Sequence, residues 1–293
     1  MRTVLIANPW ATRVDEQRLI RVRAALPEGT ELRLTSVRGE AADFARECAA
    51  GRFDALYVFG GDGTYNEVLN GIDRTTPVGL IPGGGTSVLP RALGLPREPV
   101  AAARHLSSVA QPRRIALGRV NGHRFAFACG IGLDAEVVRA VDALGRRADG
   151  RRPGNLAFAW TGVRTLAHHR YRLEPALEVT GHGRAAFAVV SNGPAYSYAG
   201  RVPLQPAPEA RFESGLDLVA PTQMRARDIP RFARYAVGWG DRTKARDLLY
   251  IHDANRLEIV CDRPLPLQVD GEDLGDIEHA VLEAERDAVT VLV

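Results

Sequence analysis

The sequence has few cysteines, few aromatic residues and no long apolar run, and these shortages exclude several classes of protein. The three cysteines lie far apart and form no C-x-x-C pair: Cys48, Cys129 and Cys261. This argues against a disulfide framework or a zinc site and favours a reducing compartment. No apolar stretch approaches the roughly 18 residues that cross a bilayer. The apolar start at 4–7 ends at Asn8-Pro9, which is too short for a signal-peptide core.

Lysine is also nearly absent, because Lys244 is the only one. With 38 basic and 35 acidic residues the net charge is +3, so the protein is mildly basic and we expect no nucleic-acid partner. A hydrophobic content of 45% and a charged content of 25% exclude a disordered chain. The length of 293 residues favours two domains.

The first part of the chain alternates short apolar runs with patterns of helical period. Such repeated alternation predicts an α/β domain with a parallel sheet that has helices on both faces. The predicted strands are 3–7, 31–35, 55–59 and 78–81, and the predicted helices are 14–26, 40–50 and 64–72.

The pattern changes after about residue 115. Asn121-Gly122 lies between two apolar runs, and this dipeptide is a strong signal for a tight hairpin. Helices are predicted at 134–144 and 156–166, with a loop at 145–154 between them. The remaining short strands predict a β-rich sandwich, as at 177–180, 185–191, 216–219, 257–261 and 265–269. A last strand is predicted at 289–293, and the pattern does not say which sheet it joins. We therefore expect an α/β domain at 1–115, a β-rich domain at 116–279, and a final segment, 280–293, that returns to the first domain.

One motif points to chemistry: the strand 55–59 runs into Gly60-Gly61-Asp62-Gly63-Thr64 and then into a helix. Glycines let backbone N–H groups approach an oxyanion, and the helix N-terminus adds its positive dipole end. The motif therefore predicts a phosphate cradle, in which Asp62 would meet phosphate through Mg²⁺ or water. The alternative is a structural turn in which Asp62 or Thr64 caps the helix.

Further segments surround this motif along nearly the whole chain: Asn8-Pro9, Thr35 with Gly39 and Ala41, 61–67, 82–84, 91–96, 130–136 and 270–272. Together they resemble the signature of the diacylglycerol kinase catalytic-domain family, the lipid kinases that include the sphingosine kinases. The resemblance implies that the first domain binds ATP and that the β-rich domain holds a lipid. It also implies Mg²⁺-dependent transfer of the γ-phosphoryl group to a hydroxyl of diacylglycerol or a related lipid.

The resemblance assigns roles to four acidic residues. Glu272 is implied to accept the hydroxyl proton and belongs with Asp270 to the closing Asp-Gly-Glu, although an ordinary exposed turn is the alternative. Asp134 is implied to join Asp62 in a water-linked magnesium network, and it can also cap the helix at 134–144. The implied nucleotide contacts are Asn8, Thr35, Gly60, Gly61, Asp62, Gly63, Thr64, Asn66, Gly84 and Thr86.

A second metal position is implied in the β-rich domain. Ser214-Gly215-Leu216-Asp217 resembles the family's Asp-Gly-x-Leu-Asp segment, with Ser214 in place of the first acidic residue. The predicted ligands are Asp217 and the backbone oxygens of Ser214 and Val219. A single carboxylate makes a weak site for a divalent cation, and a surface strand without metal is the alternative.

The sequence departs from the family pattern in the segment after the fourth strand. In an alignment without gaps, Gly85 and Ser87 stand where the family has Thr and Asn. If the alignment is shifted by one residue, Thr86 matches the family Thr but Val88 then stands at the Asn position. Pro90 disfavours a helix there. Two alternatives to a lipid kinase stay open: an NAD kinase-like enzyme, which shares Gly-Gly-Asp-Gly-Thr, and an inactive relative that binds nucleotide or lipid. Glu272 and the segment 91–96 argue against the NAD kinase.

Basic clusters suggest contact with an anionic membrane. They are Arg146, Arg147, Arg151 and Arg152, the segment 168–172, and Arg225, Arg227, Arg231 and Arg234. The alternative is that these are solvated side chains of an arginine-rich protein. We expect a cytoplasmic protein, peripheral to the inner face of the membrane, and a homodimer is possible.

Overall fold

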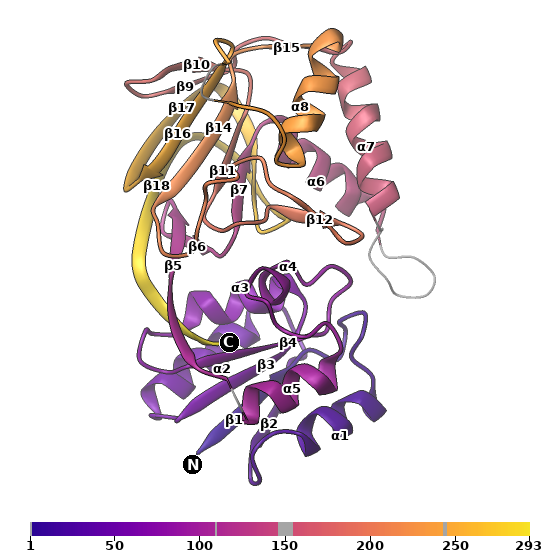
Figure 1. The fold of residues 1–293 in the computed structure, drawn as a ribbon, viewed down its shortest axis with the longest axis vertical. Coiled ribbons are helices and arrows are strands. Elements are labelled where there is room, and N and C mark those ends of the chain that lie inside the picture. Colours follow the sequence, from indigo (N-terminus) through magenta and orange to yellow (C-terminus); the bar gives the residue numbers. More distant parts are fainter. Residues whose placement is uncertain (1, 109, 146–154, 243–244) are drawn as a thin grey trace. The chain divides into compact units, whose positions relative to one another are not determined.

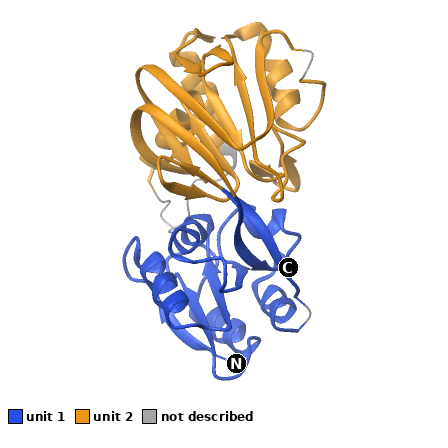
Figure 2. Ribbon diagram, turned by 90° about the vertical axis from the view of Figure 1, so that its left-hand side faces the viewer, with its two compact units in different colours: residues 1–117, 286–293 blue, residues 118–285 orange. Residues whose placement is uncertain are grey.

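The computed structural model describes residues 2–108, 110–145, 155–242 and 245–293. The chain forms two compact units: unit 1 contains residues 1–117 and 286–293, and unit 2 contains residues 118–285 (Figures 1 and 2). The chain passes from one unit to the other inside two strands, β5 (Pro112–Val120) and β18 (Glu272–Leu292). The sequence predicts boundaries at 115/116 and 279/280.

Unit 1 is built on a parallel sheet. Its strands run in the order β18, β4 (Val78–Pro82), β3 (Ala55–Gly60), β1 (Thr3–Ala7), β2 (Glu31–Leu34), and all of these pairs are parallel. The helices are α1 (Glu16–Ala24), α2 (Glu40–Ala50), α3 (Asp62–Gly71), α4 (Val88–Ala92) and α5 (Pro99–Ser108). Because β2 and β3 flank β1 on opposite sides, right-handed crossovers place α1 and α2 on opposite faces of the sheet.

The central strands of unit 1 are almost entirely apolar because they are covered on both faces. All residues of β1, β3 and β4 are buried, from Val4 to Ala7 and from Leu56 to Phe59 in particular. A strand that is buried on both faces has a continuous run of apolar residues in its sequence. This pattern is the basis on which a parallel sheet is predicted. The predicted fold class is confirmed for this unit.

Unit 2 is built on an antiparallel sheet with the strand order β16 (Leu248–Ala254), β14 (Leu216–Pro221), β11 (Ala188–Ser191), β7 (Ala128–Ile131), β17 (Arg256–Val269), β18. Shorter strands extend it: β6 (His123–Phe125) beside β5, and β9 (Leu177–Val179) with β10 (Gly183–Ala185) beside β17. Two small ribbons complete the unit, β8 (Arg172–Leu173) with β15 (Met224–Arg225), and β12 (Ser197–Ala199) with β13 (Val202–Leu204).

The helical elements of unit 2 are α6 (Leu133–Ala143), α7 (Asn155–His168), the short 3₁₀ helix η1 (Ala226–Asp228) and α8 (Ile229–Ala236). One buried cluster fills the centre of the sheet, with Phe125, Ile131, Leu218 and Ile259 among its members. Two hairpins use the tight turn expected from their sequence. Asn121-Gly122 and Asp270-Gly271 all have positive φ, as a two-residue turn between antiparallel strands requires. The predicted β-rich class is confirmed.

Several details differ from the sequence predictions. The short strands predicted at 257–261 and 265–269 form one strand, β17, because irregular register between Val260 and Leu265 absorbs the interruption. The prediction that Pro90 disfavours a helix is wrong. Pro90 lies in the first turn of α4, where its missing N–H has no intrahelical partner to lose. The predicted loop at 145–154 falls outside the described residues from 146 on.

The described parts of the chain contain no helix that is both long enough and apolar enough to cross a membrane.

Candidate functional site

In unit 1, the loops that follow β1, β3 and β4 meet at the carboxyl edge of the parallel sheet. The backbone N–H of Asn8 donates to the carbonyl of Phe59 (3.0 Å), and the N–H of Gly83 donates to the carbonyl of Gly60 (2.7 Å). The side-chain amide of Asn8 donates to the hydroxyl of Thr64 (3.0 Å). Ligands of open parallel sheets bind at this edge, so the structure brings Asn8, Gly60 and Thr64 together where a ligand is expected.

The glycines of these loops have two different roles. A Cβ on Gly84 would lie 2.9 Å from the Cα of Gly61, so glycine is required there for two backbone segments to approach each other. A Cβ on Gly85 would meet nothing within 4 Å, and Gly85 is exposed. The space beside Gly85 is therefore open to a ligand, whereas Gly84 is fixed by packing.

Helix α3 begins at the predicted cradle. Its N-cap is Gly61, and no side chain of the described residues caps it by a hydrogen bond. An uncapped first turn leaves N–H groups that an anion can bind, assisted by the helix dipole. Asp62 does not cap its own helix as the alternative interpretation proposes. Its carboxylate accepts the N–H of Leu89 (3.4 Å) in the first turn of α4, and so links α3 to α4.

The other predicted nucleotide residues of unit 1 lie near the same edge. Thr35 is buried just after β2, and its N–H donates to the carbonyl of Ala7 (3.0 Å). Asn66 is buried in α3, where its side-chain oxygen accepts from the side chain of Asn70 (3.1 Å). Gly63 and Thr86 are partly exposed. These positions are compatible with the predicted contacts and do not test them.

Ser87, the residue at the departure from the family pattern, is turned back on its own loop. It is buried with φ of 50°, and its hydroxyl accepts the N–H of Gly84 (3.2 Å). The side chain therefore closes a turn that begins at Gly84. In this structure the polar side chain at position 87 therefore stabilises its own loop.

In unit 2, Asp134 is a buried carboxylate with two side-chain donors. The hydroxyl of Tyr196 donates to its Oδ1 (2.5 Å), and the amide of Gln268 donates to its Oδ2 (2.7 Å). Burial raises the pKa of Asp134, and the two hydrogen bonds act in the opposite direction. Asp134 lies at the second position of α6 with Gly132 as the N-cap, so the cap role that the sequence also allows is not used.

The same network reaches the predicted Asp-Gly-Glu. The side-chain oxygen of Gln268 accepts the N–H of Gly271 (2.8 Å), so one carboxamide joins Asp134 to the turn. The carboxylate of Asp270 accepts three backbone N–H groups, those of Ala126 (2.7 Å), Phe127 (3.0 Å) and Ala128 (3.1 Å). Asp270 therefore stabilises the turn, and partly exposed Glu272 follows it at the start of β18.

An arginine holds the segment after Glu272. The guanidinium of Arg139, on α6, donates two hydrogen bonds to Asp273 (2.8 and 3.0 Å) and forms an ion pair with Asp276 (2.7 Å). The structure thus brings the predicted residues Asp134, Asp270 and Glu272 into one region of unit 2. Sequence reasoning missed Gln268, Arg139 and the hydroxyl contact of Tyr196. The only signal for Gln268 is that it is the one polar residue of the predicted strand 265–269.

The predicted metal ligands in unit 2 have other partners. The carboxylate of Asp217 is fully buried and contacts Nδ1 of His252 at 2.9 Å and 3.0 Å, and it also accepts the N–H of Asp253 (3.1 Å). The hydroxyl of Ser214 donates to the carbonyl of Arg211 (2.8 Å), and Val219 lies within β14. Among the described residues no group of three or more His, Cys, Asp or Glu side chains is arranged to hold a metal. The imidazole of His252 lies beside Asp217. The metal site predicted from one carboxylate and two backbone oxygens stays a prediction.

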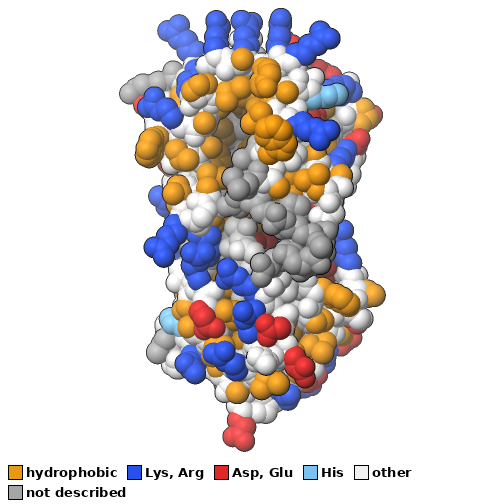
Figure 3. Space-filling view, turned by 90° about the vertical axis from the view of Figure 1, so that its right-hand side faces the viewer, with side chains coloured by type: hydrophobic (Ala, Val, Ile, Leu, Met, Phe, Trp, Pro, Cys, Tyr) orange, Lys and Arg blue, Asp and Glu red, His pale blue; other side chains and the backbone are white. Residues whose placement is uncertain are grey.

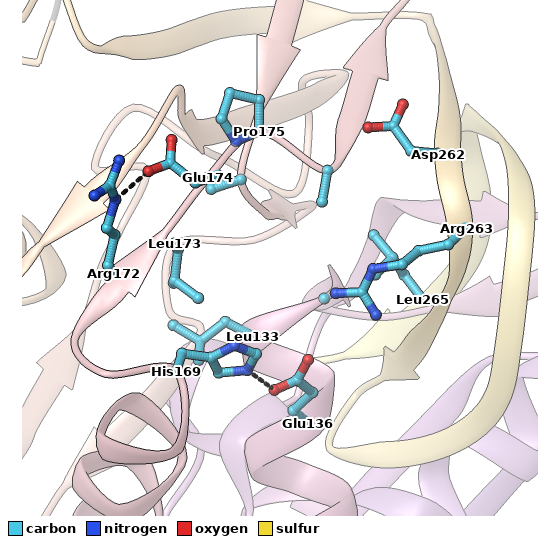
Figure 4. A pocket seen from close by; sticks show the side chains of 13 residues that line it. Leu133, Glu136, His169, Arg172, Leu173, Glu174, Pro175, Asp262, Arg263 and Leu265 are labelled. Atoms are coloured by element: carbon cyan, nitrogen blue, oxygen red, sulfur yellow. Dashed lines mark hydrogen bonds and ion pairs between the residues drawn. The ribbon is translucent and has the colours of Figure 1, made fainter.

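Unit 2 also contains a cavity of about 440 Å³ beside the first turn of α6 (Figure 4). Its walls combine apolar residues, Leu133, Leu173 and Leu265 among them, with charged ones, and Arg263 reaches in from β17. The other charged lining residues are Glu136, Arg172, Glu174 and Asp262. Glu136 and His169 form a hydrogen bond on one side, with Oε2 and Nε2 2.7 Å apart. Such a cavity suits a ligand that has both apolar and polar groups.

The fold and these sites define a class: an α/β unit with a glycine-rich turn at the carboxyl edge of its parallel sheet, combined with an antiparallel unit that holds a buried carboxylate. Kinases of diacylglycerol and of NAD share this class. Comparison with known proteins agrees. Residues 2–120 match the diacylglycerol kinase catalytic domain, and residues 128–293 match the YegS C-terminal NAD kinase beta sandwich-like domain. The chain belongs to the diacylglycerol kinase catalytic-domain family, a family of lipid kinases, as the sequence motifs predict.

Individual relatives point the same way. A diacylglycerol kinase from Bacillus subtilis (strain 168) is 30% identical, and the similarity covers 92% of this chain and 89% of that protein. A crystal structure described as a diacylglycerol kinase from Bacillus anthracis str. Sterne is 21% identical with a TM-score of 0.71, covering 99% and 96% of the two chains. An NAD kinase from Archaeoglobus fulgidus, solved in complex with ATP, is 13% identical with a TM-score of 0.52, covering 99% and 92%. At these identities the two solved structures show a shared fold.

Proposed function

We propose that the protein is an ATP-dependent lipid kinase that transfers the γ-phosphoryl group to a hydroxyl of diacylglycerol or a related lipid. The observation that carries the proposal is the hydrogen-bonded network of Asp134, Gln268 and the Asp-Gly-Glu turn. A buried carboxylate costs free energy, and a carboxylate whose pKa is raised by burial is typical of a functional site. Membership of a lipid kinase family supports the same conclusion.

The nucleotide is proposed to bind at the carboxyl edge of the sheet in unit 1. The uncapped N-terminus of α3 and the open space beside Gly85 suit the phosphates of ATP. Asn8 and Thr64 hold the two flanking loops together, and both present polar groups at this edge. ATP with Mg²⁺ would supply the phosphoryl group and neutralise its charge.

The carboxylates of the chain are proposed to orient the acceptor and take its proton. Glu272 takes the proton of the lipid hydroxyl, and Gln268 and Arg139 fix the turn on which Glu272 lies. Asp134, held by Tyr196 and Gln268, orients water or a cation in unit 2. Asp62 has the corresponding role at the nucleotide site of unit 1. Asp270 fixes the backbone of the turn and does not react.

The lipid is proposed to occupy the cavity of unit 2. Its apolar walls, formed in part by Leu133, Leu173 and Leu265, suit an acyl chain, and its polar groups suit a glycerol or ester group. The first turn of α6 borders the cavity and carries Asp134 one residue after Leu133. A lipid held there would have its polar end near the same turn of helix.

The test is to incubate the purified protein with labelled ATP, Mg²⁺ and an extracted lipid pool, with NAD in a parallel reaction, and to separate organic from aqueous label. Label in lipid supports the proposal. Label on NAD indicates the NAD kinase-like alternative, and label in neither indicates an inactive relative, so either result overturns the proposal.

Glu272→Gln tests the role of the proposed base. The variant should lose at least about a hundredfold in kcat while ATP binding is retained. Glu283→Gln is the matched control, because Glu283 lies on the same strand and pairs with Arg256 at the surface. Unchanged turnover in Glu272→Gln would remove Glu272 as the base.

A further inference from the structure

The cavity of unit 2 is bordered by an irregular stretch of β17. The register of β17 on β18 shifts between Val260 and Leu265, and Arg263 lies within this interruption. Such irregularities turn a side chain away from its regular direction in a strand. The N–H of Asp262 donates to the carbonyl of Ala176 (3.0 Å), so the irregular stretch is fixed to another lining residue of the cavity. Arg263 is therefore part of the lining, and Figure 4 shows its side chain extending into the cavity.

The other charged side chains of the lining have partners within unit 2. The pairs are Glu136 with His169, Arg172 with Glu174, and Asp262 with Arg184. Among the described residues, the guanidinium of Arg263 has no hydrogen-bond or ion-pair partner. The N–H donors and the positive charge of Arg263 are therefore left for a ligand. Because the remaining charges are already compensated, the cavity favours one anionic group at Arg263.

An exposed arginine by itself indicates nothing about a ligand. Exposed arginines are common in this protein, and Figure 3 shows basic side chains gathered along the upper edge of unit 2. Arg263 differs because it lies at a cavity of about 440 Å³, a volume within the range of small-molecule sites. The first turn of α6 borders the same cavity through Gly132 and Leu133, and no side chain of the described residues caps it by a hydrogen bond. The N–H groups of that turn add to the preference for an anion.

The ligand also needs an apolar part, because Leu133, Leu173 and Leu265 line the same cavity. We propose that the cavity binds a lipid phosphate, with its phosphate group at Arg263 and an acyl chain along the leucines. A guanidinium donates paired hydrogen bonds to a phosphate, and such charge-assisted bonds are stronger than those between neutral groups. A neutral diacylglycerol would leave the guanidinium without a partner and is therefore the weaker ligand.

The choice of a lipid phosphate as the ligand rests on the proposed function. Transfer of the γ-phosphoryl group from ATP to a lipid hydroxyl gives ADP and a lipid phosphate, and the hydroxyl proton passes to the base. The product thus gains the charge for which Arg263 offers a partner, so it binds more tightly than the neutral acceptor. Accumulated product should slow the enzyme until a following reaction removes the lipid phosphate.

Calorimetric titration with short-chain lipids, in the absence of ATP and below the concentration at which they form micelles, tests the site. The probes are dihexanoyl phosphatidic acid, dihexanoylglycerol, which lacks the phosphate, and glycerol 3-phosphate, which lacks the chains. The wild-type protein should bind dihexanoyl phosphatidic acid at least about tenfold more tightly than either of the others. Arg263→Gln should weaken this binding by at least about tenfold and leave that of dihexanoylglycerol nearly unchanged. Dependence on Arg263 separates the site from the glycine-rich turn of unit 1, which also suits phosphate.

Further variants separate the charge of Arg263 from its paired donors. Arg256→Gln is the matched control, because Arg256 lies on the same strand and pairs with Glu283 at the surface. It should bind dihexanoyl phosphatidic acid as the wild type does. Arg263→Lys keeps the charge but not the fork of donors, so its affinity should lie between those of the wild type and Arg263→Gln. Added salt should weaken the binding of dihexanoyl phosphatidic acid more in the wild type than in Arg263→Gln.

The kinase assay adds a second readout. Dihexanoyl phosphatidic acid should inhibit the phosphorylation of dihexanoylglycerol in competition with the lipid. Arg263→Gln should raise the ratio of the inhibition constant to KM by at least about tenfold, because only the charged product loses a partner. A ratio that does not change would overturn the proposal.

The outcomes distinguish this proposal from the proposed function. Binding of dihexanoyl phosphatidic acid that depends on Arg263 supports the proposal. No binding by the wild type, or equal binding by Arg263→Gln, overturns it. Glycerol 3-phosphate bound as tightly as the lipid overturns it too, because the ligand would then be a soluble phosphate. If no lipid is phosphorylated but the binding results hold, the proposed function fails and the site stands.

Discussion

Gly130 lies against Asp134 so closely that a Cβ at position 130 would be 1.7 Å from Oδ2 of the carboxylate. Gly130 is on β7 and Asp134 is on α6, so the strand can pass the buried carboxylate only if it has no side chain there. A glycine in this strand is therefore required by the site and not by the backbone conformation. This relationship leads to the first prediction.

Gly130→Ala should displace Asp134, lower the free energy of unfolding by about 2 kcal/mol and abolish activity. Urea denaturation and the kinase assay measure the two effects. The double variant Gly130→Ala, Asp134→Ala should recover most of the stability and none of the activity. Gly162→Ala on α7 is the control, because a Cβ there meets nothing within 4 Å, and alanine should add up to about 1 kcal/mol. A Gly130→Ala protein with normal stability would contradict the close contact.

Tyr196→Phe removes one of the two side-chain donors of Asp134. Burial raises the pKa of Asp134, and the tyrosine hydroxyl lowers it, so loss of the hydroxyl should raise this pKa further. If the reaction needs the ionised carboxylate, the acid limb of the pH profile of kcat should move to higher pH. Tyr198→Phe, two residues along, is the matched control. A profile that moves to lower pH, or does not move, would show that Asp134 does not titrate in the reaction.

Arg139→Lys should change catalysis more than stability. Lysine keeps the positive charge but cannot donate the paired hydrogen bonds that Arg139 makes to Asp273. The side chain of Arg139 is 40% exposed, so the loss of stability should stay below about 1 kcal/mol. We expect kcat to fall about tenfold because the turn that carries Glu272 is held less firmly. A lower melting temperature with unchanged kcat would indicate a purely structural role.

His252→Gln should make stability less dependent on pH. The hydrogen bond to Asp217 raises the pKa of His252, so the imidazolium is favoured in the folded protein. The contribution of the imidazolium to stability is therefore fully present below the ordinary histidine pKa of about 6.5. It is lost as the pH rises through the pKa that His252 has in the folded protein. Burial raises the pKa of Asp217, and the imidazole offsets part of that cost.

The free energy of unfolding of His252→Gln should be lower than that of the wild type by about 1 kcal/mol at pH 5.5. This value already allows for solvent screening, because the histidine side chain is 45% exposed. The difference should become smaller at pH 8.5, as measured by denaturation in urea. His279→Gln is the control, since His279 and Glu258 form a pair at the surface. If the difference in unfolding free energy instead became larger at higher pH, the proposed stabilisation by the imidazolium would be wrong.

Mg²⁺ without nucleotide should leave the melting temperature unchanged, and so should a chelator. The carboxylate of Asp217 already has the imidazole of His252 and the N–H of Asp253 as partners, so little capacity remains for a cation. Differential scanning calorimetry of the wild type and Asp217→Asn, with and without Mg²⁺, provides the test. Stabilisation of the wild-type protein by millimolar Mg²⁺, lost in Asp217→Asn, would instead support the metal site predicted from the sequence.

The sequence predicted the fold class because periodicity is local. The apolar runs at 3–7 and 55–59 reveal strands buried on both faces, and Asn121-Gly122 reveals a hairpin, so neither needs a knowledge of distant contacts. The long strands β17 and β18 were beyond such reasoning. Their polar and proline residues interrupt the local pattern, and only pairing with distant strands keeps them extended.

The candidate site was predictable in its motifs and not in its supporting contacts. Asp62, Asp134 and Asp-Gly-Glu stand in recognisable segments, whereas Gln268 is an isolated polar residue that acquires its role from a partner 134 positions away in sequence. Ser87 shows the opposite case. Its sequence position suggested a missing phosphate ligand, and its buried contact with Gly84 gives it a local structural role that no motif encodes.

The division of β18 between the two sheets has a consequence for biosynthesis. Val291 pairs with Val78 of β4, and Val293 exchanges backbone hydrogen bonds with Gln111, so the sheet of unit 1 includes residues that follow the whole of unit 2 in sequence. The ribosome therefore releases all of unit 2 before unit 1 has its last strand. During translation unit 1 stays incomplete, with an open sheet edge, until unit 2 has emerged.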